Sequence, residues 1–211
     1  MLAAIAAGHE LETVFALVGD PVAEPLPGTA YVSAEVLERL APTQHPRGPV
    51  AVMVVPPSVE ASRSCLLLLG IGDPGNMGTL IRSAAAFGMD VAVDSTSTDP
   101  WSPKALRAAA GGHFRTTIER EATPESLQTR GFTTVAAVPR AGVDPVELAH
   151  EDRIVIIIGP EAGGLPAHIV TASDLLVTIP MPGGMESLNA GIAGAILAYE
   201  YSRHHRGIED V

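Results

Sequence analysis

Short apolar runs alternate with helical stretches along the last two thirds of this chain. From residue 64 onward the pattern predicts strands at 65–69, 91–93, 133–137, 154–158 and 175–179. It predicts helices near 77–87, 103–111, 124–129, 166–171 and 187–203. Because these strands are continuously apolar rather than alternating, they indicate a parallel sheet that is covered on both faces. The predicted fold class is therefore α/β.

Residues 8–57 carry a separate, smaller α/β pattern. It predicts a strand at 13–18, a helix at 33–40 with Ser33 as its cap, and a strand at 50–55. Pro56 and Pro57 close the last strand. We expect one domain over residues 1–60 and a second over 61–211. An additional α/β layer on a single domain is the alternative.

Composition adds limits on the core and the compartment. Of the 211 residues, 46% are hydrophobic and only 4% aromatic, so the core is expected to be aliphatic. The single cysteine, Cys65, excludes an internal disulfide and suits a reducing compartment. No apolar run is long enough to span a bilayer, and the first residues do not read as a signal peptide. We therefore expect a cytoplasmic protein, and the histidines show no metal-ligand spacing.

Three of the predicted strands lead into glycine-rich loops that are followed by a helix. The first loop, 70–82, reads GIGDPGNMGTLIR; the second, 159–165, reads GPEAGGL; the third, 179–191, reads IPMPGGMESLNAG. Glycine and proline form loops whose backbone can approach a ligand closely. Taken singly, each is also compatible with a capped helix after a turn. Their occurrence together predicts a ligand site built from loops.

The first loop also satisfies the dinucleotide fingerprint G-x-G-x-x-G. Asp94 ends the next strand, where an acidic residue would bind the ribose of a nicotinamide cofactor. An NAD-dependent Rossmann oxidoreductase is therefore one alternative. It leaves the two later loops unexplained, and dinucleotide binding does not require Asn76 or Arg82.

In their order and residues, the three loops resemble the motifs of the SpoU/TrmH family of RNA ribose 2′-O-methyltransferases. The resemblance covers about residues 64–203. It implies a SPOUT-type α/β catalytic domain with a C-terminal trefoil knot, and a homodimer whose subunits share active sites. It also implies methyl transfer from S-adenosylmethionine to a ribose 2′-hydroxyl of rRNA or tRNA. Residues 1–60 resemble part of a ribosomal-protein-like RNA-binding domain, truncated or reduced because little precedes Glu10.

The resemblance also assigns site residues. The catalytic set that it implies is Arg82, Asn76, Glu161, Ser187 and Asn189. The donor-binding set that it implies is Val138, Pro139, Gly159, Pro160, Glu161, Ile179, Met181, Ser187 and Leu188. Since an arginine is hardly ever neutral, we expect Arg82 to bind the adjacent phosphate and stabilise a developing alkoxide. We expect Glu161 to accept backbone N–H groups or to bond Asn76.

One residue departs from the family pattern. Ala162 stands where the second motif commonly has glycine. If that position needs a positive φ, alanine would strain the loop slightly.

The charge of the chain restricts where RNA can bind. The net charge is −11, with 13 basic against 24 acidic residues, whereas phosphate binding requires positive charge. An RNA surface must therefore be local, and its candidates are Arg82, Lys104, Arg107 and Arg115, with Arg140 further away. A non-catalytic knotted dimer that binds only RNA or the donor is a second alternative.

Overall fold

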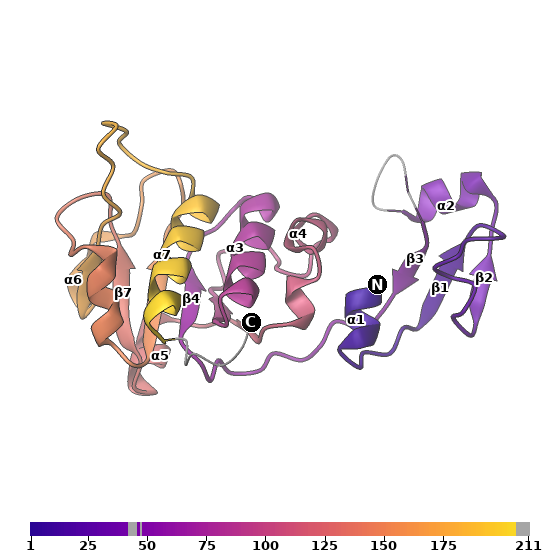
Figure 1. Cartoon of the computed structure of the whole chain (residues 1–211), viewed down its shortest axis with the longest axis horizontal. Helices are drawn as coiled ribbons and strands as arrows, with labels where there is room; N and C mark the ends of the chain where they lie inside the picture. Colours follow the sequence, from indigo (N-terminus) through magenta and orange to yellow (C-terminus); the bar gives the residue numbers. More distant parts are fainter. Residues whose placement is uncertain (42–45, 47, 206–211) are drawn as a thin grey trace. The chain divides into compact units, whose positions relative to one another are not determined.

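The computed structural model describes residues 1–41, 46 and 48–205. The chain divides into two compact units, Met1–Pro57 and Ser58–Val211, each with a sheet of its own (Figure 1). A substrate-binding role for the first segment stays a prediction.

The first unit is built on a mixed three-stranded sheet in the order β2–β1–β3. β1 (Thr13–Ala16) pairs in parallel with β2 (Thr29–Tyr31) and antiparallel with β3 (Val50–Val52). The Oγ atom of Ser33 accepts a hydrogen bond from the backbone N–H of Val36, so the predicted cap of α2 (Ala34–Leu40) is confirmed. α1 (Leu2–Ala6) and β2 were not predicted, because five and three residues are too short to show a period.

The second unit contains a six-stranded parallel sheet in the order β6–β5–β4–β8–β7–β9. Its strands are β4 (Cys65–Leu68), β5 (Asp90–Val93), β6 (Ile118–Arg120), β7 (Thr133–Ala137), β8 (Ile154–Ile158) and β9 (Leu175–Val177). The five predicted strands are confirmed and β6 was missed. β9 ends two residues earlier than predicted, so residues 178 and 179 belong to the loop that follows it.

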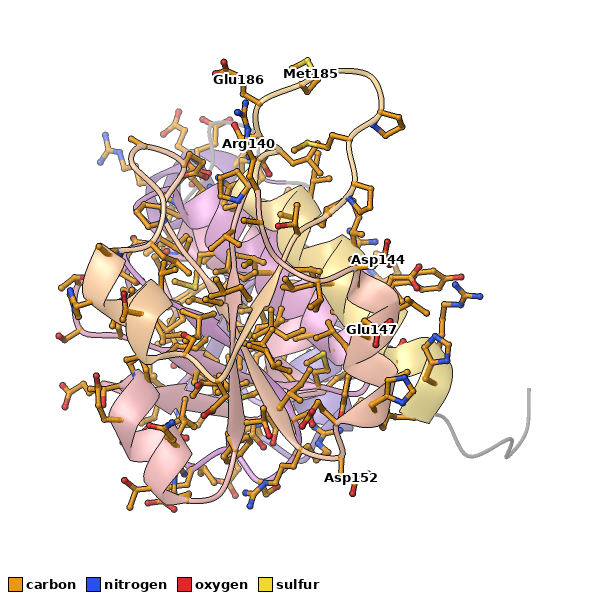
Figure 2. All side chains as sticks on the ribbon, turned by 90° about the vertical axis from the view of Figure 1, so that its left-hand side faces the viewer. Arg140, Asp144, Glu147, Asp152, Met185 and Glu186 are labelled. Atoms are coloured by element: carbon orange, nitrogen blue, oxygen red, sulfur yellow. The ribbon has the colours of Figure 1, made fainter. Side chains whose placement is uncertain are left out.

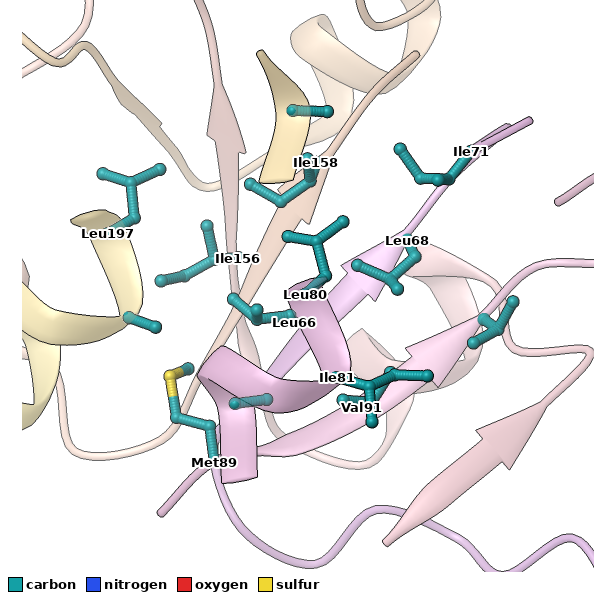
Figure 3. Close-up of a cluster of buried hydrophobic side chains, with 14 of the residues drawn as sticks. Leu66, Leu68, Ile71, Leu80, Ile81, Met89, Val91, Ile156, Ile158 and Leu197 are labelled. Atoms are coloured by element: carbon teal, nitrogen blue, oxygen red, sulfur yellow. The ribbon is translucent and has the colours of Figure 1, made fainter. Parts of the chain in front are cut away.

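Helices cover both faces of this sheet, as the continuous apolar strands predicted. α3 (Pro74–Ala86), α4 (Pro103–Ala109) and α7 (Ala190–His205) pack on the face that carries Leu66, Leu68 and Ile156 (Figure 3). α5 (Pro124–Thr129) and α6 (Ala167–Ala172) pack on the opposite face. The short 3₁₀ helices η1 (Gly112–Phe114) and η2 (Pro145–His150) were not predicted. Among the described residues, no helix is long and apolar enough to cross a membrane.

Two helices begin three residues away from the predicted positions. α3 begins at Pro74 because Oδ1 of Asp73 accepts a hydrogen bond from the backbone N–H of Asn76, at 3.0 Å. α7 begins at Ala190 instead of residue 187, and Oδ1 of Asn189 accepts from the backbone N–H of Ile192, at 3.2 Å. Asn76 therefore lies in the first turn of its helix, and its side chain is available for other contacts.

A glycine lies at the contact between α3 and α4. A Cβ atom at Gly78 would lie 2.4 Å from the carbonyl oxygen of Ala105 and 2.5 Å from Cβ of Ala108. Since the backbone of α4 would have to shift, we expect Gly78→Ala to lower the free energy of unfolding by about 1–3 kcal/mol. Urea denaturation measures this, with Gly72→Ala as the control because nothing lies within 4 Å of a Cβ there. Equal midpoints for the two variants would contradict the prediction.

Candidate active site

A cavity of about 540 Å³ lies at the carboxyl ends of β7, β8 and β9. In open parallel sheets this is the edge at which ligands bind. Three segments line the cavity: 138–140 after β7, 159–165 after β8, and 179–188 after β9. The structure brings all nine residues of the predicted donor-binding set to its wall: Val138, Pro139, Gly159, Pro160, Glu161, Ile179, Met181, Ser187 and Leu188.

The loop after β8 needs its glycines. A Cβ atom at Gly159 would lie 3.0 Å from the backbone nitrogen of Leu165, because the loop folds back on itself there. Gly163 and Gly164 have φ values of +88° and +65°, a region that side chains disfavour. Ala162 is not among the residues with positive φ, so the strain considered for this position does not arise.

Three polar side chains, one from each glycine-rich segment, form a hydrogen-bonded chain. Nδ2 of Asn76 donates to Oε1 of Glu161, which is one of the two contacts expected for Glu161. Nδ2 of Asn189 donates to Oδ1 of Asn76 at 3.0 Å. Both amides are thereby oriented, since Oδ1 of Asn189 also accepts from the backbone of α7. Segments more than 80 residues apart in the sequence are tied together beside the cavity.

Arg82 and Ser187 do not take part in this hydrogen-bonded chain. Ser187 is exposed and, like Glu161, lines the cavity. Arg82 is exposed on α3, about 9 Å along the helix from Asn76 and about 120° around it. No residue in the described ranges is hydrogen-bonded or ion-paired to its guanidinium. The backbone of η1 packs closely against the backbone of Arg82, since a Cβ atom at Gly112 would lie 3.0 Å from Cα of Arg82.

The G-x-G-x-x-G loop does not form a dinucleotide site. The Asp94 carboxylate accepts hydrogen bonds from the backbone N–H of Gly70, at 3.0 Å, and from Oγ of Ser97, at 2.6 Å. Burial by itself would raise the pKa of Asp94, but these hydrogen bonds outweigh it and lower the pKa. The carboxylate is thus used to hold the loop. As far as the described residues go, the cavity wall includes none of Gly70, Gly72 and Gly75.

Comparison with known proteins identifies the family. Residues 63–199 match the sequence profile of the SpoU rRNA Methylase family. The 23S rRNA (guanosine(2553)-2'-O)-methyltransferase RlmP of Bacillus subtilis is 32% identical in an alignment over 181 residues that covers 83% of this chain and 71% of that protein. This chain belongs to the SpoU/TrmH family of RNA 2′-O-methyltransferases.

Solved structures of SpoU-family proteins share this fold. The SpoU methyltransferase AviRb from Streptomyces viridochromogenes, in complex with the cofactor AdoMet, aligns with a TM-score of 0.81 at 25% identity. That alignment covers 96% of this chain and 86% of AviRb. A structure of an RNA 2′-O ribose methyltransferase aligns with a TM-score of 0.81 at 30% identity, covering 96% and 84%. The family predicted from the three loops is confirmed, and the Rossmann alternative is wrong.

The basic residues predicted to bind RNA all lie on the surface of the SpoU-family unit. Arg82, Lys104, Arg107 and Arg115 are exposed or partly exposed. Lys104 forms an ion pair with Asp73, with 2.8 Å between Nζ and Oδ2, and this pair lowers the pKa of Asp73. Exposed ion pairs contribute little to stability, so a phosphate can compete for Lys104. Contact of these four residues with RNA stays a prediction.

Sequence reasoning left several cavity residues out of the donor-binding set of this SpoU-family chain. Two of them are charged: Glu186 lies in the third glycine-rich loop, and Arg140 directly follows Val138 and Pro139 of the predicted set. The wall also includes apolar residues of the strands and of α7: Ala137, Ile158, Val177, Ala190, Ala193 and Leu197. Their strand and helix pattern marks them as core, so no sequence signal separates them from other buried residues. In the part of the chain that the structure describes, no three or more His, Cys, Asp or Glu side chains are grouped to hold a metal ion.

Proposed function

We propose that this chain transfers a methyl group from S-adenosylmethionine, bound in the cavity over β7–β9, to a ribose 2′-hydroxyl of rRNA or tRNA. The observation that carries the proposal is the hydrogen-bonded chain from Glu161 through Asn76 to Asn189, beside a cavity that all nine predicted donor contacts line. Membership of the SpoU/TrmH family supports the reaction, and the AdoMet complex of AviRb supports the donor.

The residues of the cavity fit such a donor. Its wall combines apolar side chains such as Ile179 and Leu188 with the glycine-rich backbone of the 159–165 loop. These groups suit an adenosine, which needs an apolar slot and a few backbone hydrogen bonds. When bound, the donor supplies an electrophilic methyl group on a sulfonium.

Arg82 and the amide chain have separate roles in this proposal. The ribose hydroxyl is a weak nucleophile, and its oxygen gains negative charge as its proton leaves to solvent water. The Arg82 guanidinium remains protonated, so it binds the neighbouring phosphate and stabilises that charge instead of accepting the proton. Asn76 and Asn189 hold Glu161 in a fixed orientation at the cavity wall. Ser187 is positioned to contact the substrate from the third loop.

A knotted homodimer with shared active sites is part of the proposal. Arg82 projects about 120° away from Asn76 around α3, so a second surface is needed to bring it to a donor. Apolar side chains that an interface would cover are exposed on or next to α7: Met185 is 68%, Ile192 51% and Tyr199 46% exposed. Sedimentation equilibrium at micromolar concentration should give twice the mass of the chain. A monomer would exclude shared sites.

The proposal includes two further points. Residues 1–57 help to hold the RNA, and the protein methylates its substrate in the cytoplasm. The first unit has its own sheet and core, as a separate binding domain requires. The lone buried thiol of Cys65 is compatible with a reducing compartment. Ultraviolet crosslinking to RNA, followed by peptide mapping, should find crosslinks within residues 1–57. Crosslinks confined to residues 58–205 would contradict this role.

The reaction is tested by incubating the protein with tritium-labelled S-adenosylmethionine and unmodified rRNA or tRNA. We expect label in a dinucleotide that resists alkaline hydrolysis, because a 2′-O-methyl group blocks cleavage of the adjacent linkage. Titrations with S-adenosylmethionine and NAD run in parallel. Donor binding without transfer to any RNA would favour the non-catalytic dimer, and binding of neither ligand would contradict the proposal as a whole.

A further inference from the structure

The cavity wall carries an unequal set of charges. Of the described residues that line it, Glu161 and Glu186 are acidic and Arg140 is the one with a basic side chain. Figure 2 shows Arg140 at the same end of the unit as Met185 and Glu186, and Asp152 at the opposite end. Within the described ranges, no residue is hydrogen-bonded or ion-paired to the Arg140 guanidinium. A cation at the wall is thus available to a ligand.

The loop that carries Arg140 is held firmly to the segment after β9. The backbone N–H of Val138 donates to the carbonyl of Val177 at 2.9 Å. Oγ1 of Thr178 donates to the carbonyl of Val138 at 3.0 Å and accepts from the backbone N–H of Gly142 at 2.9 Å. A Cβ atom at Gly142 would lie 2.6 Å from the backbone carbon of Val177, so glycine permits this close approach.

The backbone next to Arg140 adopts an unusual conformation. Ala141 has a φ of +64°, which is disfavoured for a residue with a side chain. Strained backbone of this kind persists where the surrounding structure fixes it, as the bonds to Thr178 do here. The base of the Arg140 side chain is therefore fixed before a ligand binds.

The chemistry of the proposed donor calls for such a cation. S-adenosylmethionine carries a sulfonium, an ammonium and an α-carboxylate. In a chain with a net charge of −11, Glu161 and Glu186 favour the two cationic groups and repel the carboxylate. An arginine binds a carboxylate through two parallel N–H···O bonds, which fix its orientation as well as its position.

We propose that Arg140 binds the α-carboxylate of the donor and thereby sets which end of the donor faces the 138–142 loop. The proposal rests on the function proposed above, because it needs S-adenosylmethionine in this cavity. The adenosine end then occupies the part of the cavity lined by Ile158, Val177 and Leu197.

Calorimetric titration with S-adenosylmethionine and with its decarboxylated analogue tests this role, since the two ligands differ only in the carboxylate. We expect Arg140→Gln to weaken binding of S-adenosylmethionine at least about tenfold. Binding of the decarboxylated analogue should stay within about twofold, so the preference for the carboxylate is lost. Arg140→Lys should keep part of the preference. Arg39→Gln, which removes an exposed arginine from α2, is the matched control and should bind as the wild type does.

The other outcomes are distinct. Equal weakening for both ligands would mean that Arg140 maintains the shape of the cavity and does not bind the carboxylate, which would overturn the proposal. Unchanged affinity for both ligands with weaker RNA binding would make Arg140 a phosphate contact and also overturn it. If the wild-type protein bound neither ligand, the proposed function would fail first, and the role of Arg140 would fail with it.

Discussion

Replacing Arg82 by alanine is expected to lower the rate of methyl transfer by about 100- to 1,000-fold, which is the usual effect of removing a group that stabilises transition-state charge. Donor affinity should stay within about twofold, because Arg82 is exposed on α3 and is not among the residues that line the cavity in the described chain. Single-turnover rates with labelled donor measure the first quantity, and calorimetry measures the second.

The lysine variant separates the two possible roles of this side chain. Arg82→Lys keeps the charge but loses the planar guanidinium. We therefore expect an intermediate rate of methyl transfer, with the same dependence on pH as the wild type. If residue 82 accepted the proton, the lysine variant would gain activity as the pH approached the ordinary lysine pKa of about 10.4. Arg120→Ala is the control for loss of an exposed arginine, because Arg120 lies on β6, outside both residues 1–57 and the cavity wall. A wild-type rate for Arg82→Ala, or a parallel loss of donor affinity, would contradict the assignment.

The strands that the sequence predicted most accurately are those buried on both faces. β7 and β8 have the predicted bounds. For β8 the signal is local, because Arg153 and Gly159 flank a continuous apolar run. β6 was missed because its middle residue is Glu119. That carboxylate is buried, and it accepts from Nη2 of Arg130 at 2.8 Å and from the backbone N–H of Ala61 at 2.7 Å. Distant partners stabilise it there, and no local pattern reveals them.

The start of α7 also shows that local sequence patterns do not fix every element boundary. Ser187 and Asn189 are both good N-cap residues, so propensity alone does not choose between them. In the structure, Asn189 caps the helix and also donates to Asn76, a residue that lies 113 positions earlier. The residue that caps this helix therefore also makes a tertiary hydrogen bond, which the local sequence does not reveal.

The candidate site followed from the family motifs more than from local chemistry. All nine residues of the predicted donor-binding set line one cavity, including Val138 and Pro139, which lie outside the three motifs and were assigned by the family resemblance. The sequence marked Arg140 only as a distant candidate for the RNA surface, and its position at the same cavity wall as Glu161 and Glu186 is known only from the structure. Likewise, the ion pair of Lys104 with Asp73 joins residues 31 positions apart, so the sequence did not show that this cation already has a partner.

Replacing Asn76 by aspartate is expected to lower methyl transfer about 100-fold at neutral pH and to restore part of it as the pH falls. Nδ2 of Asn76 donates to Glu161, whereas its Oδ1 accepts from Asn189. Aspartate keeps the acceptor for Asn189 but sets an oxygen against the Glu161 carboxylate. Two carboxylates in contact cannot both ionise easily, so the pKa of one of them rises.

The direction of the pH dependence follows from that raised pKa. Below it, the two carboxyl groups share a proton and can form a hydrogen bond, which restores the native link between the first and second loops. As the pH rises through it, the proton is lost, the two side chains repel and activity falls. Rates and donor affinities measured between about pH 5 and 8 test this, with Asn76→Ala as the control because it removes the bond without adding a charge. An Asn76→Asp profile as flat as that of the alanine variant would show that Glu161 does not need a donor at this position.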